Sequence, residues 1–156
     1  MIEVDIQRVC AAGGLPPQHR MREWVRHAVA TRRRHGSLGV RLVDADEGAA
    51  LNKRWRGKRG PTNVLSFPAG DDALAKVAPG VLGDLVLCVP VLKAEAKAQR
   101  KTIAAHCAHL LVHGSLHLLG MDHQDEAQAR RMERLERRLL AELGFPDPYA
   151  TTQDHD

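Results

Sequence analysis

The sequence is poor in cysteine and has no apolar run long enough to cross a membrane. Its three cysteines, Cys10, Cys88 and Cys107, form no Cys-x-x-Cys pair, which argues against a disulfide framework and favours a reducing compartment. No apolar stretch approaches the roughly 18 residues of a membrane span, and residues 1–6 carry acids where a signal peptide would be apolar. We therefore expect a cytoplasmic protein with no membrane partner, in which Cys88 and Cys107 are small core residues.

Internal repeats, linkers and extremes of composition are also missing from the 156 residues. Hydrophobic residues make up 44% and charged residues 27%, a globular balance that excludes wholesale disorder. The excess of 23 Lys and Arg over 19 Asp and Glu gives a net charge of +4, which permits an anionic partner such as nucleic acid without requiring one. We predict one domain over residues 1–150, with a frayed tail that starts near Tyr149 and leaves residues 151–156 disordered.

Hydrophobic periodicity predicts an α+β domain with about four strands in a mixed sheet packed with helices. Alternating apolar residues or short apolar runs indicate strands at residues 2–6, 38–42, 64–67 and 83–89. Helical periodicity and end signals indicate helices at residues 18–35, 44–54, 90–100, 102–119 and 125–143. The last helix begins after the N-cap Asp125 and ends at Gly144. The helix over 102–119 is apolar on most sides, so we expect it at the centre of the fold.

Three histidines on or just after this central helix, His113, His117 and His123, have the most informative spacing in the chain. On a helix, residues four apart lie about 40° apart around the axis and roughly 6 Å apart along it, so two imidazoles can reach one ion. His123 can join them only if the chain folds back, which Gly120 permits because glycine tolerates the left-handed conformation. Three imidazoles with an open fourth position are typical of a catalytic zinc, so we predict one Zn²⁺ here.

Gly114 distinguishes this site from a protease site of the same spacing. The pattern H-x3-H-x2-G-x2-H occurs in a large class of metalloproteases, whose glutamate after the first histidine is the general base. That position is Gly114 here, and a glycine inside a helix predicts a close approach by another backbone or by substrate. Two residues near this motif each have two possible roles. His109 either supports a metal ligand or only packs in the core. Asp122 either orients an imidazole by accepting its second N–H or caps the helix that follows.

Five cations crowd residues 53–59, just before the predicted strand at 64–67. A charge run of this kind is most often a solvated loop. The alternative is that one or two of its side chains, such as Arg56 or Lys58, hold a phosphate, which arginine binds through two parallel hydrogen bonds. Trp55 in the same run either offers a surface on which a base stacks or packs into the core.

Together, these segments resemble the YbeY family of bacterial endoribonucleases and rRNA maturation factors. The resemblance rests on residues 56–67, which include Pro-Thr-Asn-Val-Leu-Ser-Phe, on Leu-Gly-Asp at 82–84, and on the histidine segment 113–123. Residues 143–148 extend the similarity to the C-terminal region, so that it covers nearly the whole chain in order.

The resemblance implies a metal-dependent endoribonuclease directed at single strands, acting in maturation of small-subunit rRNA and in ribosome quality control. It also implies zinc on the three histidines, a functional arginine at Arg56, and RNA and the small ribosomal subunit or its assembly factors as partners. Two positions depart from the family pattern. Arg59 stands where an aspartate is usual, which leaves any role of that carboxylate without a residue here. Met121 replaces the common tyrosine, which we expect to change only packing.

As a mechanistic hypothesis, the zinc binds a water and lowers its pKa toward about 7. The hydroxide, or a ribose 2′-hydroxyl that it activates, attacks the phosphodiester while Arg56 neutralises charge on the phosphoryl oxygens. Two other classes stay open: a metal-dependent hydrolase of another substrate, and a non-enzymatic zinc-containing ribosome-assembly factor. Gly114 argues against a peptidase, whereas a closed site with His109 as fourth ligand would favour the assembly factor.

Overall fold

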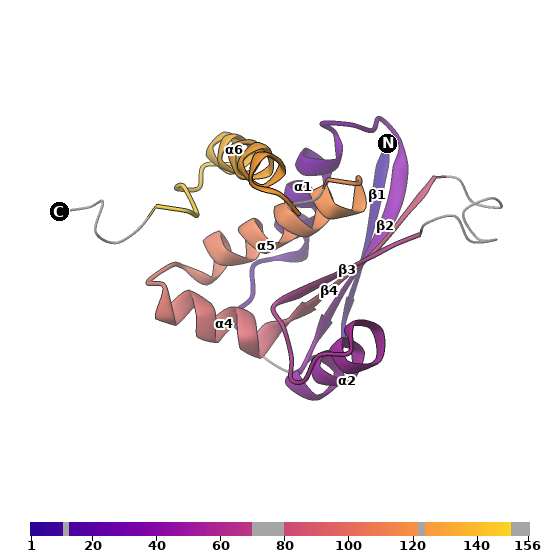
Figure 1. Ribbon diagram of the computed structural model, residues 1–156, viewed down its shortest axis with the longest axis vertical. Helices are drawn as coiled ribbons and strands as arrows, with labels where there is room; N and C mark the ends of the chain where they lie inside the picture. Colours follow the sequence, from indigo (N-terminus) through magenta and orange to yellow (C-terminus); the bar gives the residue numbers. More distant parts are fainter. Residues whose placement is uncertain (11–12, 70–79, 122–123, 151–156) are drawn as a thin grey trace.

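The computed structural model describes residues 1–10, 13–69, 80–121 and 124–150. Its elements follow in the order β1 (Ile2–Arg8), α1 (Gln18–Val29), β2 (Gly36–Val43), α2 (Ala45–Arg56), β3 (Val64–Pro68), β4 (Val81–Cys88), α4 (Val89–Ala98), α5 (Ile103–Leu118) and α6 (Glu126–Glu142). These elements confirm the predicted α+β class with a four-stranded mixed sheet packed with helices, as Figure 1 shows.

The sheet has the strand order β1-β2-β4-β3, in which β1, β2 and β4 are parallel and β3 is an antiparallel edge strand. Burial alternates along β1, where Ile2, Val4 and Ile6 are buried and the residues between them are exposed. The register places Val4 beside Leu38 and Val40 beside Leu85, so the buried positions of the parallel strands form one apolar face. This face is the one that the helices need to cover.

Helix α5 lies at the centre of the molecule, as the sequence predicts. It contacts α1, α4, α6, β3 and β4, and most of its residues are buried, among them Leu111 and Leu116. Figure 1 shows α1, α5 and α6 on one side of the sheet and α2 apart from them, near the far end of the strands. Trp24 and Val25 of α1 add large buried side chains to the core that α5 shares with the sheet. The helix that carries the histidines is therefore held from several sides.

Two helices end at glycines in the left-handed conformation that the sequence predicts. Gly120 follows α5 with φ +93°, and the amide of Met121 donates to the carbonyl oxygen of Leu116 at 3.1 Å. Gly144 follows α6 with φ +90°, and the carboxylate of Asp125 caps the other end of that helix. Both ends satisfy backbone groups that a helix terminus leaves open.

Helix α1 is shorter than predicted. The prediction of a helix over 18–35 is wrong beyond Val29, where the buried apolar side of the helix ends and the amide of Arg33 donates back to the Val29 carbonyl oxygen at 3.0 Å. The residues that follow return the chain to Gly36, which pairs with Ile2 at the start of β2. Three consecutive arginines suit this exposed return better than a packed helix.

All three cysteines are buried and free, which confirms Cys88 and Cys107 as core residues and adds Cys10 to them. No disulfide therefore braces the described fold, and its stability rests on apolar packing. Within the described ranges, no helix has both the length and the apolar character that crossing a membrane requires.

Candidate metal centre

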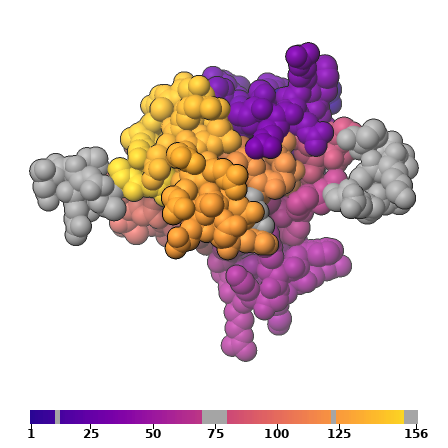
Figure 2. Space-filling model, turned by 45° about the horizontal axis from the view of Figure 1, so that its top comes forward, coloured from indigo at the N-terminus to yellow at the C-terminus, as the bar shows by residue number. Residues whose placement is uncertain are grey.

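The C-terminal half of α5 lines a cleft of about 720 Å³. His109, His113 and His117 contribute part of the lining, and Arg56 and Lys58 reach the same cleft from the end of α2 and the loop after it. Figure 2 shows the region around α2, in purple, projecting from the body of the molecule. Among the described lining residues none is an aspartate or glutamate, so an anionic ligand meets only cationic and neutral groups there.

His113 and His117 face each other across one turn of α5. Their Nε2 atoms are 3.2 Å apart, and the ring planes are inclined at 76°. Two nitrogen ligands of a tetrahedral zinc ion, each about 2.0–2.1 Å from the metal, are separated by roughly 3.3 Å. The two imidazoles are therefore spaced as two ligands of one ion, which is the arrangement that the four-residue spacing predicts.

The third predicted ligand, His123, and its neighbour Asp122 lie outside the described residues. Among the residues that are described, no group of three His, Cys, Asp or Glu side chains could hold a metal ion. The chain does turn directly after α5, because Gly120 has a positive φ and its amide donates to the His117 carbonyl oxygen at 3.0 Å. This turn is what a returning third histidine requires, and the complete set of three ligands stays a prediction.

Glu136 of α6 is a fully buried carboxylate beside the histidines. Its Oε1 lies 2.7 Å from Nδ1 of His113 and 3.3 Å from Nε2 of His109, and its Oε2 accepts a hydrogen bond from the Tyr149 hydroxyl at 2.6 Å. Burial alone would raise the pKa of Glu136, but the hydrogen bonds from His109, His113 and Tyr149 outweigh it and lower this pKa to about 2. The carboxylate is thus ionised at neutral pH and fully engaged.

His109 and Tyr149 complete this cluster. Nε2 of His109 lies 3.3 Å from the Tyr149 hydroxyl as well as from Glu136, and the two rings pack edge to face with centroids 5.3 Å apart. His109 thus contacts Glu136, the carboxylate that also contacts His113. This is the position expected of a residue that supports a metal ligand. The prediction that the chain frays from Tyr149 is wrong for that residue, because its ring packs on His109 and its hydroxyl donates to Glu136. Residues 151–156 lie outside the described part.

Gly114 lets α5 approach the sheet. A methyl group at this position would lie 2.9 Å from Cδ2 of Leu85 and 3.3 Å from Oγ of Ser66. The close approach that the sequence predicts is therefore present, but the neighbours are side chains of β3 and β4, neither a backbone nor a substrate. A glutamate at position 114 would have to displace these side chains, so the position that carries the peptidase base is packed against the sheet here.

Arg56 and Lys58 supply positive charge to the cleft. Arg56 is the last residue of α2, which ends at Gly57 with φ +66°, and both cations are exposed. Within the described part of the chain, neither Arg56 nor Lys58 forms an ion pair, so their charge is available to a ligand. Arg56 thus lines the same cleft as the histidines, whereas its catalytic role stays a prediction.

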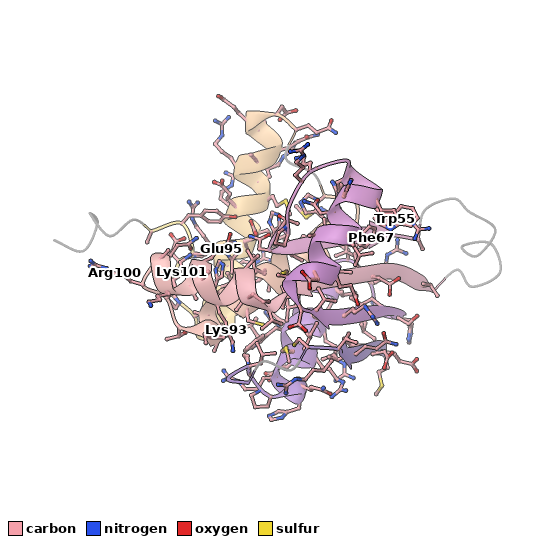
Figure 3. The ribbon with its side chains drawn as sticks, turned by 90° about the horizontal axis from the view of Figure 1, so that it is seen from below. Trp55, Phe67, Lys93, Glu95, Arg100 and Lys101 are labelled. Atoms are coloured by element: carbon pink, nitrogen blue, oxygen red, sulfur yellow. The ribbon has the colours of Figure 1, made fainter. Side chains whose placement is uncertain are left out.

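Trp55 lies apart from the histidines. Its side chain is 59% exposed, so it is not a core residue, and it lines a second cleft of about 860 Å³ together with Asp84. Figure 3 shows Trp55 next to Phe67, and their rings meet edge to face with centroids 6.2 Å apart. Arg56 lines both clefts. Base stacking on Trp55 stays a prediction, and the Trp55 side chain lines the second cleft and not the histidine cleft.

Comparison with known proteins identifies the family. The family model described as Endoribonuclease YbeY matches residues 15–144. The chain belongs to the YbeY family. Endoribonuclease YbeY of Stutzerimonas stutzeri is 52% identical over 152 residues, which cover 96% of this chain and 92% of that protein. The YbeY of Halorhodospira halophila is 51% identical over 149 residues, covering 95% of this chain and 96% of that protein.

A solved structure supports the fold assignment. The solution structure of TM1509 from Thermotoga maritima superposes with a TM-score of 0.60 and covers 96% of this chain and 99% of that one. At 22% identity, this similarity shows the fold alone. Of the two departures from the YbeY pattern, Arg59 is exposed in the loop after α2, and Met121 packs partly buried against the core. Met121 thus has the packing role expected of it.

A second carboxylate, that of Glu95, binds Asn63 in the segment before β3. Oε1 of Glu95 on α4 lies 2.9 Å from Nε2 of buried His106 and accepts a hydrogen bond from Nδ2 of Asn63 at 3.0 Å. Figure 3 labels Glu95 on its helix. Asn63 also accepts from the Val64 amide at 2.6 Å, and it lines the histidine cleft. Burial lowers the pKa of His106 even though Glu95 opposes this effect. The YbeY segment containing Asn63 is thereby fixed to the helical layer.

Sequence reasoning missed Glu136 and Glu95. One signal for Glu136 was available, because this residue interrupts the buried side of α6 formed by Met132, Leu139 and Leu140. An ionisable residue on an apolar helix face needs a partner, and the histidine-rich helix was the obvious source of one. Glu95 carries no comparable signal, since glutamate is common on exposed faces of a helix rich in alanine and lysine.

Proposed function

We propose that this protein is a zinc-dependent endoribonuclease that cuts single-stranded RNA during maturation of small-subunit rRNA and in ribosome quality control, in the cytoplasm. Its YbeY relatives, about half identical over nearly the whole chain, are named endoribonucleases, which supports a nuclease that hydrolyses RNA. The observation that carries the metal dependence is the 3.2 Å separation of the His113 and His117 Nε2 atoms inside a cleft with cationic lining. Single-strand preference and the rRNA target rest on the family resemblance.

The donor set fits zinc, since His113 and His117 present imidazole nitrogens at ligand spacing, and His123 would complete the set. A zinc ion held there would supply a Lewis acid and a water molecule with a lowered pKa. The chain's own residues then bind and orient the substrate. Arg56 would donate two hydrogen bonds to one phosphate, and Lys58 would add charge to the same cleft.

The lining of the cleft favours RNA over a peptide. Because no described lining residue is acidic, a polyanion approaches without repulsion at short range. The peptidase alternative lacks its base, and Gly114 faces Leu85 and Ser66 where that base would stand. Binding should therefore weaken steeply with salt, as expected when phosphates are contacted by cations.

The non-enzymatic alternative needs a closed metal site, for which His109 was the candidate fourth ligand. Nε2 of His109 is already directed to Glu136 and Tyr149, each at 3.3 Å. A ligand role for this nitrogen would sacrifice both contacts. The arrangement thus supports a site with an open position, which a reacting phosphate or a water can occupy.

The proposal is tested by measuring zinc content and RNA cleavage on the same preparations of wild type, His117→Ala and Arg56→Ala. Matched single-stranded and duplex oligonucleotides test strand preference, and casein tests the peptidase alternative. We expect His117→Ala to lose both zinc and cleavage, and Arg56→Ala to keep zinc and lose cleavage. A zinc-free His113→Ala protein that cuts RNA at the wild-type rate would refute the mechanism. End-group analysis of the products separates hydrolysis from attack by the 2′-hydroxyl.

A further inference from the structure

We propose that Glu136 is a positioning residue that fixes the tautomer and the orientation of His113, and so directs the Nε2 lone pair of that histidine into the cleft. The proposal rests on the proposed function in one respect, namely that His113 is a metal ligand. It adds the residue that makes His113 competent to bind before any metal arrives.

The contacts of Glu136 leave little freedom to its carboxylate. Oε1 lies 2.7 Å from Nδ1 of His113, while Oε2 accepts from Tyr149 at 2.6 Å. An ionised carboxylate only accepts hydrogen bonds, so the proton between Glu136 and His113 belongs to Nδ1. A carboxylate that is buried without such donors would be strongly destabilised, which ties the position of Glu136 to these partners.

The tautomer of His113 follows from this contact. A neutral imidazole carries one N–H, and with the proton on Nδ1 the Nε2 atom has a lone pair. That atom lies 3.2 Å from Nε2 of His117, at the spacing of two ligands of one ion. A carboxylate on the far side of a ligating imidazole also makes it a better electron donor to a metal.

Two further histidines of α5, His106 and His109, are oriented the opposite way to His113. His106 and His109 turn Nε2, not Nδ1, toward Glu95 and Glu136 respectively. The Nδ1 atoms of both are buried and have no hydrogen-bond partner among the described residues. Neither residue therefore presents a nitrogen to the cleft as His113 does. Of these three histidines, Glu136 selects His113 as the one whose Nε2 lies beside His117.

Tyr149 holds the carboxylate from its other side. Its hydroxyl occupies Oε2, and its ring packs edge to face on His109 with centroids 5.3 Å apart. Rotation of the Glu136 carboxylate would break this hydrogen bond as well as the one to His113. The orientation of His113 consequently depends on a residue 36 positions further along the chain.

The test uses the full-length protein and Zn²⁺ alone as the probe. Glu136→Gln keeps the shape of the side chain and removes its charge, and Glu133→Gln on the same helix is the matched control. Nitrogen chemical shifts of the His113 ring, recorded by NMR on zinc-free protein, report which nitrogen carries the proton. Competition with a chromogenic chelator then gives the dissociation constant for zinc.

We expect the proton on Nδ1 of His113 in zinc-free wild type and in Glu133→Gln, and a mixture of tautomers in Glu136→Gln. Zinc affinity should fall roughly 10- to 100-fold in Glu136→Gln and stay unchanged in Glu133→Gln. A proton on Nε2 of His113 in the wild type overturns the proposal. So does a folded Glu136→Gln protein that binds zinc as tightly as the wild type.

Tyr149→Phe provides a second variant in case Glu136→Gln does not fold. Loss of one donor to the carboxylate should weaken zinc binding less than Glu136→Gln does, and an unchanged affinity would count against the proposal. The tautomer measurement needs no metal, so it judges Glu136 separately from the proposed function. Zinc binding that survives in His117→Ala would refute the proposed metal site. The tautomer of His113 would still be decided separately, by the NMR measurement on zinc-free protein.

Discussion

Gly114→Ala measures how closely α5 is packed against the sheet. Alanine is favoured over glycine inside a helix by about 1 kcal/mol, so this change would be stabilising in open space. Here the added methyl would lie 2.9 Å from Cδ2 of Leu85 and 3.3 Å from Oγ of Ser66. Leu85 is fully buried, so its side chain can move aside only by disturbing its packing, and overpacking of about 1–3 kcal/mol opposes the gain. We expect a net loss of up to about 2 kcal/mol in the free energy of unfolding.

The assay is urea unfolding of zinc-free protein, followed by circular dichroism. Leu85→Val is the matched background, because it removes the Cδ2 atom that the new methyl would meet. In that background Gly114→Ala should become neutral or stabilising, and the difference between the two backgrounds gives the coupling between the residues. This comparison separates a steric effect from a general change in helix stability.

A gain of about 1 kcal/mol from Gly114→Ala in the wild-type background would refute the reasoning, since it would mean that α5 has room for a side chain there. Zinc affinity gives an independent readout. A methyl that pushes α5 away from β4 also displaces His113 on the same turn, so we expect weaker zinc binding in Gly114→Ala and partial recovery with Leu85→Val.

Three further predictions concern charge and metal. Hydrogen bonds lower the pKa of Glu136 from its ordinary 4.5 to about 2 against the effect of burial. Its ionised form therefore stabilises the fold above the ordinary pKa, and this contribution disappears as the pH falls through the lower value. Urea titrations of zinc-free protein between about pH 5 and pH 2 should show wild type losing about 3 kcal/mol more than Glu136→Gln, and equal losses would contradict this. Arg56→Ala should slow RNA cleavage by about 10²–10³-fold, and Arg56→Lys should recover only part of it, because lysine lacks the paired donors. If Arg56 contacts a phosphate, RNA binding by Arg56→Ala should depend less on salt than binding by the wild type. An equal salt dependence would argue against this contact. Zinc at about a hundredfold excess over its dissociation constant should raise Tm by roughly 5–10 °C over chelated protein, and by nothing in His117→Ala. An equal rise in both would place the zinc elsewhere.

Local patterns in the sequence predict most of the fold. The alternation at Ile2, Val4 and Ile6 and the apolar character of α5 concern neighbours in the chain, so they are visible without a structure. The capping residues Asp125 and Gly144 also act within one turn of their own helix. The prediction for α1 is wrong beyond Val29, because the arginine run at residues 32–34 fits the last turn of a helix as well as an exposed return.

The site was predictable only in part, because local sequence patterns do not show which distant residues pack together. His113 and His117 meet because helical spacing brings them together, which four residues of sequence suffice to show. Glu136 and Tyr149 reach His113 and His109 through the packing of α6 and the segment beyond it, so only the tertiary fold reveals the contact. Trp55 shows the converse, since it is adjacent to Arg56 in sequence and yet points into another cleft.

The contact between Glu136 and His113 can form only late in synthesis of the chain, because Glu136 follows His113 in the sequence. A ribosome releases a chain from its N-terminus, so the sheet and α5 emerge before α6 and Tyr149. Until those last parts pack, His113 lacks the carboxylate that orients it, and the imidazole is free to take either tautomer. An unfinished chain would therefore hold metal poorly. At the proposed metal site, zinc binding should therefore follow the packing of α6 and Tyr149 against α5 and not precede it.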